Sequence, residues 1–151
     1  MFINKIPFVI MMSHNIHFST AALVKDMKNN TLITSIEQVI QAYKTCGVKI
    51  QAILADGQFK HIQQIIEQKG IMLNICAANE HVPEIERYIR TIKERVRSIA
   101  TTLPFERYPA QLIVEMVYNC VFWLNSFPHK NGIHATMSPR AIMTGQRITY
   151  V

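Results

Sequence analysis

Acidic residues at two points of the chain could together bind a divalent cation. Asp56 comes at the end of the apolar stretch 48–54, and Glu84 and Glu86 begin a stretch with helical spacing. Open α/β sheets place functional groups at the carboxyl ends of their strands, which is where this pattern puts Asp56. Hard cations such as Mg²⁺ bind a few carboxylate oxygens and retain several waters, and they support phosphodiester cleavage and strand transfer. The pattern predicts a metal site; an Asp-Gly turn and helix-dipole stabilisation of the two glutamates are the simpler alternatives.

A ridge of basic side chains follows these glutamates along the same predicted helix. Four side chains lie beside the apolar stripe, about 80–140° from Ile85 at about 100° per residue: Glu86, Arg90, Lys93 and Arg97. From Arg87 to Arg97 the chain has five bases and one acid. Lysine and arginine neutralise DNA phosphates without regard to sequence, so the ridge indicates a nucleic-acid contact. The alternative is an ordinary solvated helix face.

Other kinds of chemistry find little support in the sequence. No serine, cysteine or lysine has the surroundings of an activated nucleophile, and no glycine-rich phosphate loop occurs. His14 and His17 flank a predicted turn with no third ligand near them in sequence, which argues against zinc. The three cysteines are far apart and are expected to be buried free thiols: Cys46, Cys76 and Cys120. The longest apolar run, 112–124, is shorter than the roughly 20 residues that a bilayer requires, so no membrane partner is expected.

Extended segments dominate the first part of the chain. Runs at 7–12 and 16–24 around a polar turn suggest a hairpin, and 1–4 resembles the end of a preceding strand. A helix with Asn29, Asn30 and Thr31 as candidate caps is expected to continue to Gly47.

Strands and helices alternate after this helix. A strand is predicted at 48–54, a short helix from Phe59 to Gly70 and a strand at 71–77, which implies parallel pairing. Helices are then predicted from His81 to about Leu103 and from Pro109 to about Leu124, with a short one near 139–144. The helix after Pro109 is apolar nearly all round and is expected to be buried. Three antiparallel strands followed by parallel ones predict an α/β fold with a ribonuclease-H-like mixed sheet flanked by helices.

Composition agrees with a single folded domain that has a polyanionic partner. The 151 residues are 49% hydrophobic and 17% charged, which excludes a disordered chain and leaves ample material for a core. The net charge is +6, with a pI near 9.4. A basic balance favours nucleic acid as a partner without establishing it.

Four short motifs carry a family resemblance. Residues 54–59 resemble the Thr-Asp-Asn-Gly-x-Glu-Phe stretch around the second aspartate of retroelement integrases, and 82–87 resemble their Asn-Gly-x-x-Glu-Arg stretch. Residues 123–128 are similar to the copia-type Tyr-Leu-x-Asn-x-x-Pro stretch, and 138–146 to the Thr-Pro-Tyr-Glu-x-x-x-Gly-Lys segment that closes such cores. Four motifs in this order, across nearly the whole chain, resemble the catalytic core of a copia-type retrotransposon integrase.

The resemblance implies a role in DNA integration, through metal-dependent 3′ processing and strand transfer. It makes Asp56 and Glu86 the second and third catalytic carboxylates, which hold Mg²⁺ or Mn²⁺, and leaves Glu84 as an alternative to Glu86. It implies that element ends and target DNA contact the bases of the helix, namely Arg87, Arg90, Lys93 and Arg97. A homodimer and a nuclear or cytoplasmic location are further expectations from this resemblance.

Three departures from the family pattern modify this expectation. No acid precedes Asp26, so we expect the first catalytic aspartate to lie upstream of Met1. Residues 1–127 would then be a core that lacks the start of its first strand, with 128–151 as its C-terminal extension. Only 29 residues separate Asp56 from Glu86, fewer than the family's D,D-35-E pattern implies, and the zinc module that normally precedes the core does not occur.

Catalysis is therefore expected to be deficient. One alternative is a non-enzymatic nucleic-acid-binding remnant of a retroelement. Two others are a chain that does not fold stably and an unrelated basic α/β domain.

Overall fold

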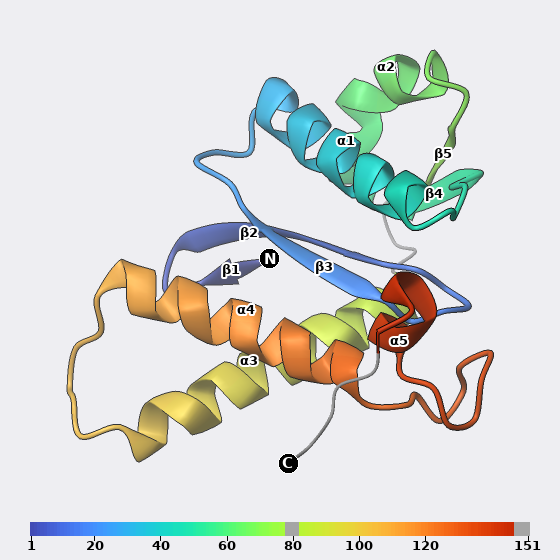
Figure 1. Ribbon diagram of the computed structural model, residues 1–151. Helices are drawn as coiled ribbons and strands as arrows, with labels where there is room; N and C mark the ends of the chain where they lie inside the picture. The colour runs from blue at the N-terminus through green and yellow to red at the C-terminus, as the bar shows by residue number, and fades with distance from the viewer. Residues whose placement is uncertain (78–81, 147–151) are drawn as a thin grey trace.

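A computed structural model describes residues 1–77 and 82–146 (Figure 1). In chain order the elements are β1 (Phe2–Ile3), β2 (Ile6–Met12), β3 (Ser19–Leu23), α1 (Asn29–Thr45), β4 (Ala52–Ala55), the 3-10 helix η1 (Gly57–Ile62), α2 (Gln63–Glu67), β5 (Met72–Ile75), α3 (Pro83–Thr102), α4 (Ala110–Ser126) and α5 (Pro139–Thr144). The predicted order of strands and helices is confirmed. The proposed start of the third long helix at His81 and the end of the C-terminal extension beyond Gln146 lie outside the described residues.

The first three strands form an antiparallel sheet in the order β1-β2-β3. Asn4 and Lys5 join β1 to β2, and both have positive φ, as tight two-residue hairpin turns require. β2 pairs with β3 from Phe8 opposite Leu23 to Met12 opposite Ser19. The predicted hairpin is therefore confirmed, with its connection at 13–18.

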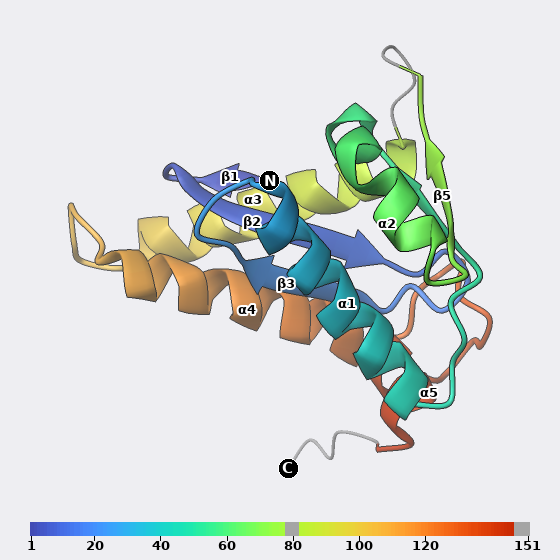
Figure 2. The ribbon, with the colours of Figure 1, turned by 90° about the horizontal axis from the view of Figure 1, so that it is seen from above.

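Helices cover both faces of this sheet (Figures 1 and 2). Successive side chains of a strand point to opposite faces, so Phe8 and Val9 of β2 enter different parts of the core. Phe8 is fully buried with Ile92 of α3 and Val117 of α4. Val9 is buried with Ile36 of α1 on the other face. Burial on both faces explains why β2 is apolar without polar alternation.

The remaining strands form a parallel pair, β4 with β5, in register from Ala52 opposite Met72 to Ala55 opposite Ile75. The crossover between them packs Ile62 and Ile66 into the core beside α1. The expected mixed α/β architecture is confirmed, but its strands form two hydrogen-bonded sheets. β1 has two residues, which is too short an edge to join the sheets with a ladder of hydrogen bonds.

The start of α1 differs from the prediction. Its N-cap is Lys28, and Asn29, Asn30 and Thr31 lie within the helix. The carboxylate of Asp26 organises the entry, because its Oδ1 accepts from Lys28 N at 3.1 Å and from Thr31 Oγ1 at 2.7 Å. These bonds, led by that of Thr31, lower the pKa of Asp26. The predicted end at Gly47 is confirmed, since Gly47 has φ 76° directly after the C-cap.

The expected full burial of α4 is wrong. Val117 and Cys120 are buried against α3 and the sheet, but the opposite side of the helix exposes large apolar side chains: Tyr118, Phe122 and Trp123. A helix that packs against one sheet face and one neighbour leaves its outer side in water. Phe122 is partly shielded by the guanidinium of Arg140, 5.0 Å from its ring centre. Among the described residues, no helix combines the length and apolarity that a membrane crossing needs.

The cysteines are free, as expected, but only Cys120 is buried. Cys46 is exposed because it follows the last residue of α1 and forms its C-cap. Cys76 is half-buried directly after β5. Their positions give no support to a shared metal site or a disulfide.

A buried polar network joins α4 to β3. The side-chain amide of Asn125 accepts from Ser19 N and Oγ, both at 2.9 Å, and donates to Ser19 O at 2.8 Å. Tyr88 of α3 shares a short hydrogen bond with Ser19 Oγ. Asn125 thus bonds both backbone groups of Ser19 as a neighbouring strand would, and it fixes α4 to the sheet.

We predict that Asn125→Ala destabilises the fold by about 2–3 kcal/mol, because it leaves the buried backbone of Ser19 without partners. Urea unfolding followed by circular dichroism measures this change. Asn119→Ala is the matched control, since Asn119 lies on the same helix but is exposed. Equal effects of the two substitutions would contradict the proposed importance of the network.

Tyr88 predicts a loss of stability in alkali. Burial raises the pKa of Tyr88 to about 12, against a partly opposing hydrogen bond from Ser19. Above pH 10 the unfolded chain loses this proton while the folded chain keeps it, so stability present below pH 10 is lost as the pH rises towards 12. In Tyr88→Phe this loss should be smaller, as chemical unfolding at pH 9 and pH 11 would measure. The same loss in both proteins would mean that Tyr88 does not contribute it.

Candidate metal and nucleic-acid site

Asp56 is placed by the junction of β4 and η1. It directly follows the buried Ala55 and is the N-cap of η1, where its Oδ1 accepts from Gln58 N at 3.0 Å. The turn reading of Asp-Gly is therefore correct in part. The residue is nevertheless exposed at the carboxyl end of the strand, and it has no salt bridge with any residue that the structure describes. Its carboxylate retains capacity to bind a cation.

The two glutamates of α3 have different surroundings. Glu84 lies between two imidazoles, with Oε2 at 2.8 Å from His14 Nδ1 and Oε1 at 3.2 Å from His17 Nδ1. Glu86 is exposed in the same first turn, and its amide donates to Val82 O at 3.1 Å. Both carboxylate oxygens of Glu84 are thus committed to histidines.

The histidines are the site residues that the sequence did not reveal. His14 and His17 belong to the connection between β2 and β3, and Glu84 follows 70 positions after His14. His129, after α4, stacks on His17 with ring centres 3.8 Å apart. Nothing in local spacing links three segments so far apart, so only the tertiary fold brings them together.

The basic ridge of α3 is solvent-exposed as predicted. Arg87, Arg90, Lys93 and Arg97 are all exposed on a helix that buries Ile92 and Val96. Arg95 lies on the other flank, about 280° from Ile85 at about 100° per residue. In agreement, its charge acts on Tyr88 and Cys120, which face α4. Arg95 therefore does not belong to the ridge.

The amino group of Met1 relates Asp56 to this ridge. It donates to Phe8 O at 2.9 Å, and its pKa is lowered first by burial and then by the charge of Lys93, while Asp56 acts in the opposite direction. Asp56 and Lys93 are thus both within electrostatic reach of the start of the antiparallel sheet. Glu86 lies seven residues before Lys93, and hence on the same side of α3.

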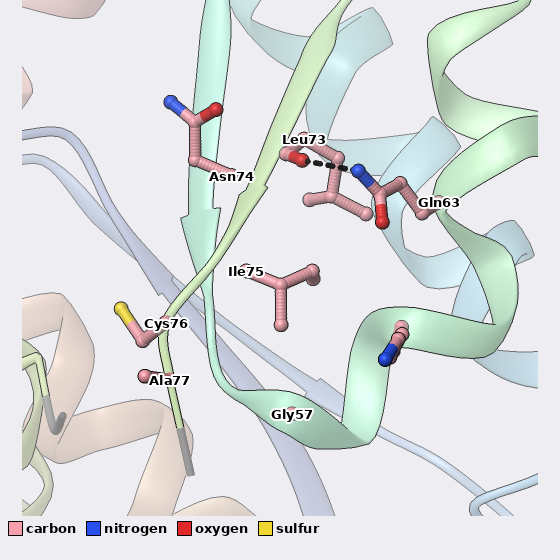
Figure 3. A pocket seen from close by; sticks show the side chains of 8 residues that line it. Gly57, Gln63, Leu73, Asn74, Ile75, Cys76 and Ala77 are labelled. Carbon is pink, nitrogen blue, oxygen red and sulfur yellow. Dashed lines mark hydrogen bonds between the residues drawn. The ribbon is translucent and has the colours of Figure 1, made fainter. Parts of the chain in front are cut away.

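A hollow opens beside Asp56 (Figure 3). It has a volume of about 460 Å³ and lies between η1, α2 and β5. Figure 3 shows Gln63 reaching toward Leu73, whose carbonyl accepts from Gln63 Nε2 at 3.1 Å, while Asn74 and Cys76 point to the other side of β5. Few polar groups converge in this open space, which is therefore a poor small-molecule site.

The donor set decides which metal could fit. Within residues 1–77 and 82–146, no three His, Cys, Asp or Glu side chains are arranged to hold a metal ion. Asp56 and Glu86 offer carboxylate oxygens alone, which are ligands for Mg²⁺ or Mn²⁺ rather than for zinc or copper. Mg²⁺ is commonly held by one or two carboxylates together with waters and substrate phosphates. The residues present fit that kind of site and do not fit a fully protein-bound ion.

Comparison with known proteins identifies the fold. No model of a protein family matches the sequence, and no curated protein matches it significantly. The structure is similar to the catalytic core domain of BIV integrase, with TM-score 0.65 and 18% identity over 94% of this chain and 88% of the other. It is also similar to the HTLV-2 integrase catalytic core domain in complex with magnesium in a trimeric form, with TM-score 0.64 and 14% identity over 93% and 88%. The chain has the ribonuclease-H-like α/β fold of integrase cores.

Proposed function

We propose that this protein is an integrase-type core with a role in DNA integration. The observation that carries the proposal is the placement of Asp56 and Lys93 around the start of the antiparallel sheet, within a fold similar to integrase cores. In this proposal Asp56 and Glu86 hold a divalent cation, and the exposed bases of α3 hold DNA beside it.

Glu86 is the better partner for Asp56 than Glu84. Glu84 already has a histidine at each oxygen, and a metal would have to displace both. When bound, Mg²⁺ or Mn²⁺ would polarise a phosphate and favour ionisation of the attacking hydroxyl. Asp56 and Glu86 make two of the three carboxylates of the integrase set, so we propose that this chain alone is deficient in strand transfer.

The ridge would bind the DNA backbone. From Arg90 to Arg97 the helix rises about 10 Å, which spans about three base steps of 3.4 Å. Arg90, Lys93 and Arg97 therefore could meet successive phosphates, with Arg87 nearby on the outer side. Binding of this kind positions DNA without reading its sequence, which suits an enzyme that acts on many targets. Element ends and target DNA are the proposed partners.

The copia type is supported by the physical roles of its motif residues. Asn125, in the stretch 123–128, fixes α4 to β3 through Ser19. In the stretch 138–146, Ser138 caps α5 by accepting from Ala141 N, and Gly145 ends it with φ 70°. These motif positions have structural reasons to recur together. Assembly as a homodimer belongs to the same proposal.

A non-enzymatic DNA-binding remnant is the second candidate. It is favoured by the two-carboxylate donor set, since among the described residues none completes a group of three. This alternative keeps the DNA contacts of α3 but requires no metal. Metal and DNA binding must therefore be measured separately.

The ridge predicts a salt-dependent loss of DNA affinity. The triple variant Arg90→Gln, Lys93→Gln, Arg97→Gln should bind duplex DNA roughly 10- to 100-fold more weakly at low salt. The slope of log affinity against log salt should become shallower by about 2–3, at about 0.9 per lost phosphate contact. Fluorescence anisotropy across a salt series measures both quantities.

A charge-matched control separates the ridge from net charge. The triple variant Lys25→Gln, Lys44→Gln, Lys49→Gln removes the same charge from exposed positions outside α3. Arg95→Gln tests the opposite flank of α3 itself. If these variants weaken binding as much as the ridge variant, DNA does not bind at the ridge.

The carboxylates predict weakened metal binding. Asp56→Asn and Glu86→Gln should each lower Mn²⁺ affinity on the order of tenfold, because each removes one of two charged ligands. Electron paramagnetic resonance of free Mn²⁺ measures this, with Glu94→Gln on the other side of α3 as control. Unchanged affinity in both site variants, with DNA binding intact, would favour the non-enzymatic remnant.

A further inference from the structure

Three segments far apart in the sequence meet at Glu84. They are the β2–β3 connection with His14 and His17, the first turn of α3, and the loop after α4 with His129 and Asn131. This cluster is separate from the proposed DNA ridge, and neither metal nor DNA is needed for it to form.

His17 occupies the centre of the cluster. Its side chain is 9% exposed, and its backbone has φ 59°, a conformation that is uncommon for a residue other than glycine. Such a conformation persists only where the surroundings fix it. Here the amide of His17 donates to Ser13 O at 3.0 Å and closes the turn.

Both ring nitrogens of His17 face acceptors. Nδ1 is 3.2 Å from Glu84 Oε1, and Nε2 is 3.3 Å from the carbonyl oxygen of Asn131. A neutral imidazole has one proton and can satisfy only one of these oxygens, whereas an imidazolium offers a proton to each. Nδ1 is buried and has no well-aligned hydrogen bond, which is costly for a neutral ring but suits an ion pair with the carboxylate.

The neighbouring titratable groups favour a single cation at this position. Among the described residues, those facing His17 are Glu84, which is shared with His14, and His129, which is stacked at 3.8 Å with its plane 17° from parallel. Two stacked imidazolium ions would repel each other. Burial and then the charge of His17 lower the pKa of His129, while Glu84 acts in the opposite direction, so His129 is the neutral member of the pair.

We propose that His17, Glu84 and Asn131 form a pH-sensitive clamp. The doubly protonated His17 ties the loop after α4 to the first turn of α3, and loss of one ring proton at higher pH releases the loop. The released loop leaves the ion pair of His14 and Glu84 at the surface, where His14 is 85% exposed. The device is a conformational switch with a histidine as its titrating group.

Ring ¹⁵N spectra of the whole chain between pH 5.5 and 8.5 test the clamp directly. At pH 6.5 the His17 ring should carry two protons and the His129 ring one, with the exposed His134 as an internal reference. In Glu84→Gln, the pH at which half of the His17 rings are doubly protonated should fall by about one unit, a tenfold change. Glu94→Gln should leave it unchanged.

Hydrogen exchange measures the mechanical part of the proposal. At pH 6.5, amides at 129–132 should exchange faster in Glu84→Gln than in Glu94→Gln, and the difference should vanish at pH 8.5. A singly protonated His17 ring in the unsubstituted protein at pH 5.5 would overturn the clamp, even if the variant fails to fold. Identical His17 titration in the two variants would overturn it as well.

Discussion

Alternation along β2 is the constraint from which the rest of the structure follows. Phe8 and Val9 are adjacent, point to opposite faces and are both buried, so neither face of the sheet can meet water. The chain supplies α1 and the parallel pair for one face and the α3–α4 hairpin for the other (Figure 2). Each half of the core therefore depends on the same strand, which couples their folding.

This packing also determines where the candidate chemistry lies. Because Ile92 and Val96 of α3 are held against the sheet and α4, one flank of that helix must face outward near the start of the sheet. Asp56 reaches the same region because β4 ends there and η1 begins with a cap that only a short polar side chain can make. The acidic and basic groups of the proposed site are thus placed by apolar residues that touch no substrate.

Local rules were enough to predict much of this fold. The bounds of α5 follow from Ser138, Pro139 and Gly145, each of which acts within its own turn, and the end of α1 at Gly47 follows in the same way. The start of α1 was wrong because the organising residue, Asp26, precedes the helix by three positions. The outer side of α4 was wrong because composition does not reveal how many neighbours a helix has.

The site was predictable only where its residues carry charge at regular spacing. The exposure of the α3 ridge follows from helical periodicity. The surroundings of Glu84 could not be predicted, because two of its partners come from a turn 70 positions earlier and a third from a loop after α4. Short-range patterns contain no information about contacts of that length.

The position of Trp123 limits what its fluorescence can report. It is the single tryptophan of the chain, it is 37% exposed, and its neighbours in ring contact are Phe122 and Phe127 at the end of α4. A side chain that already meets water in the native state changes its surroundings little on unfolding. Its emission would also be insensitive to opening of the β4–β5 half of the molecule, which lies across the sheet from α4 (Figure 1). Tryptophan emission in this protein is a probe of one corner of the surface, and the cooperativity of the core has to be followed by other spectroscopic means.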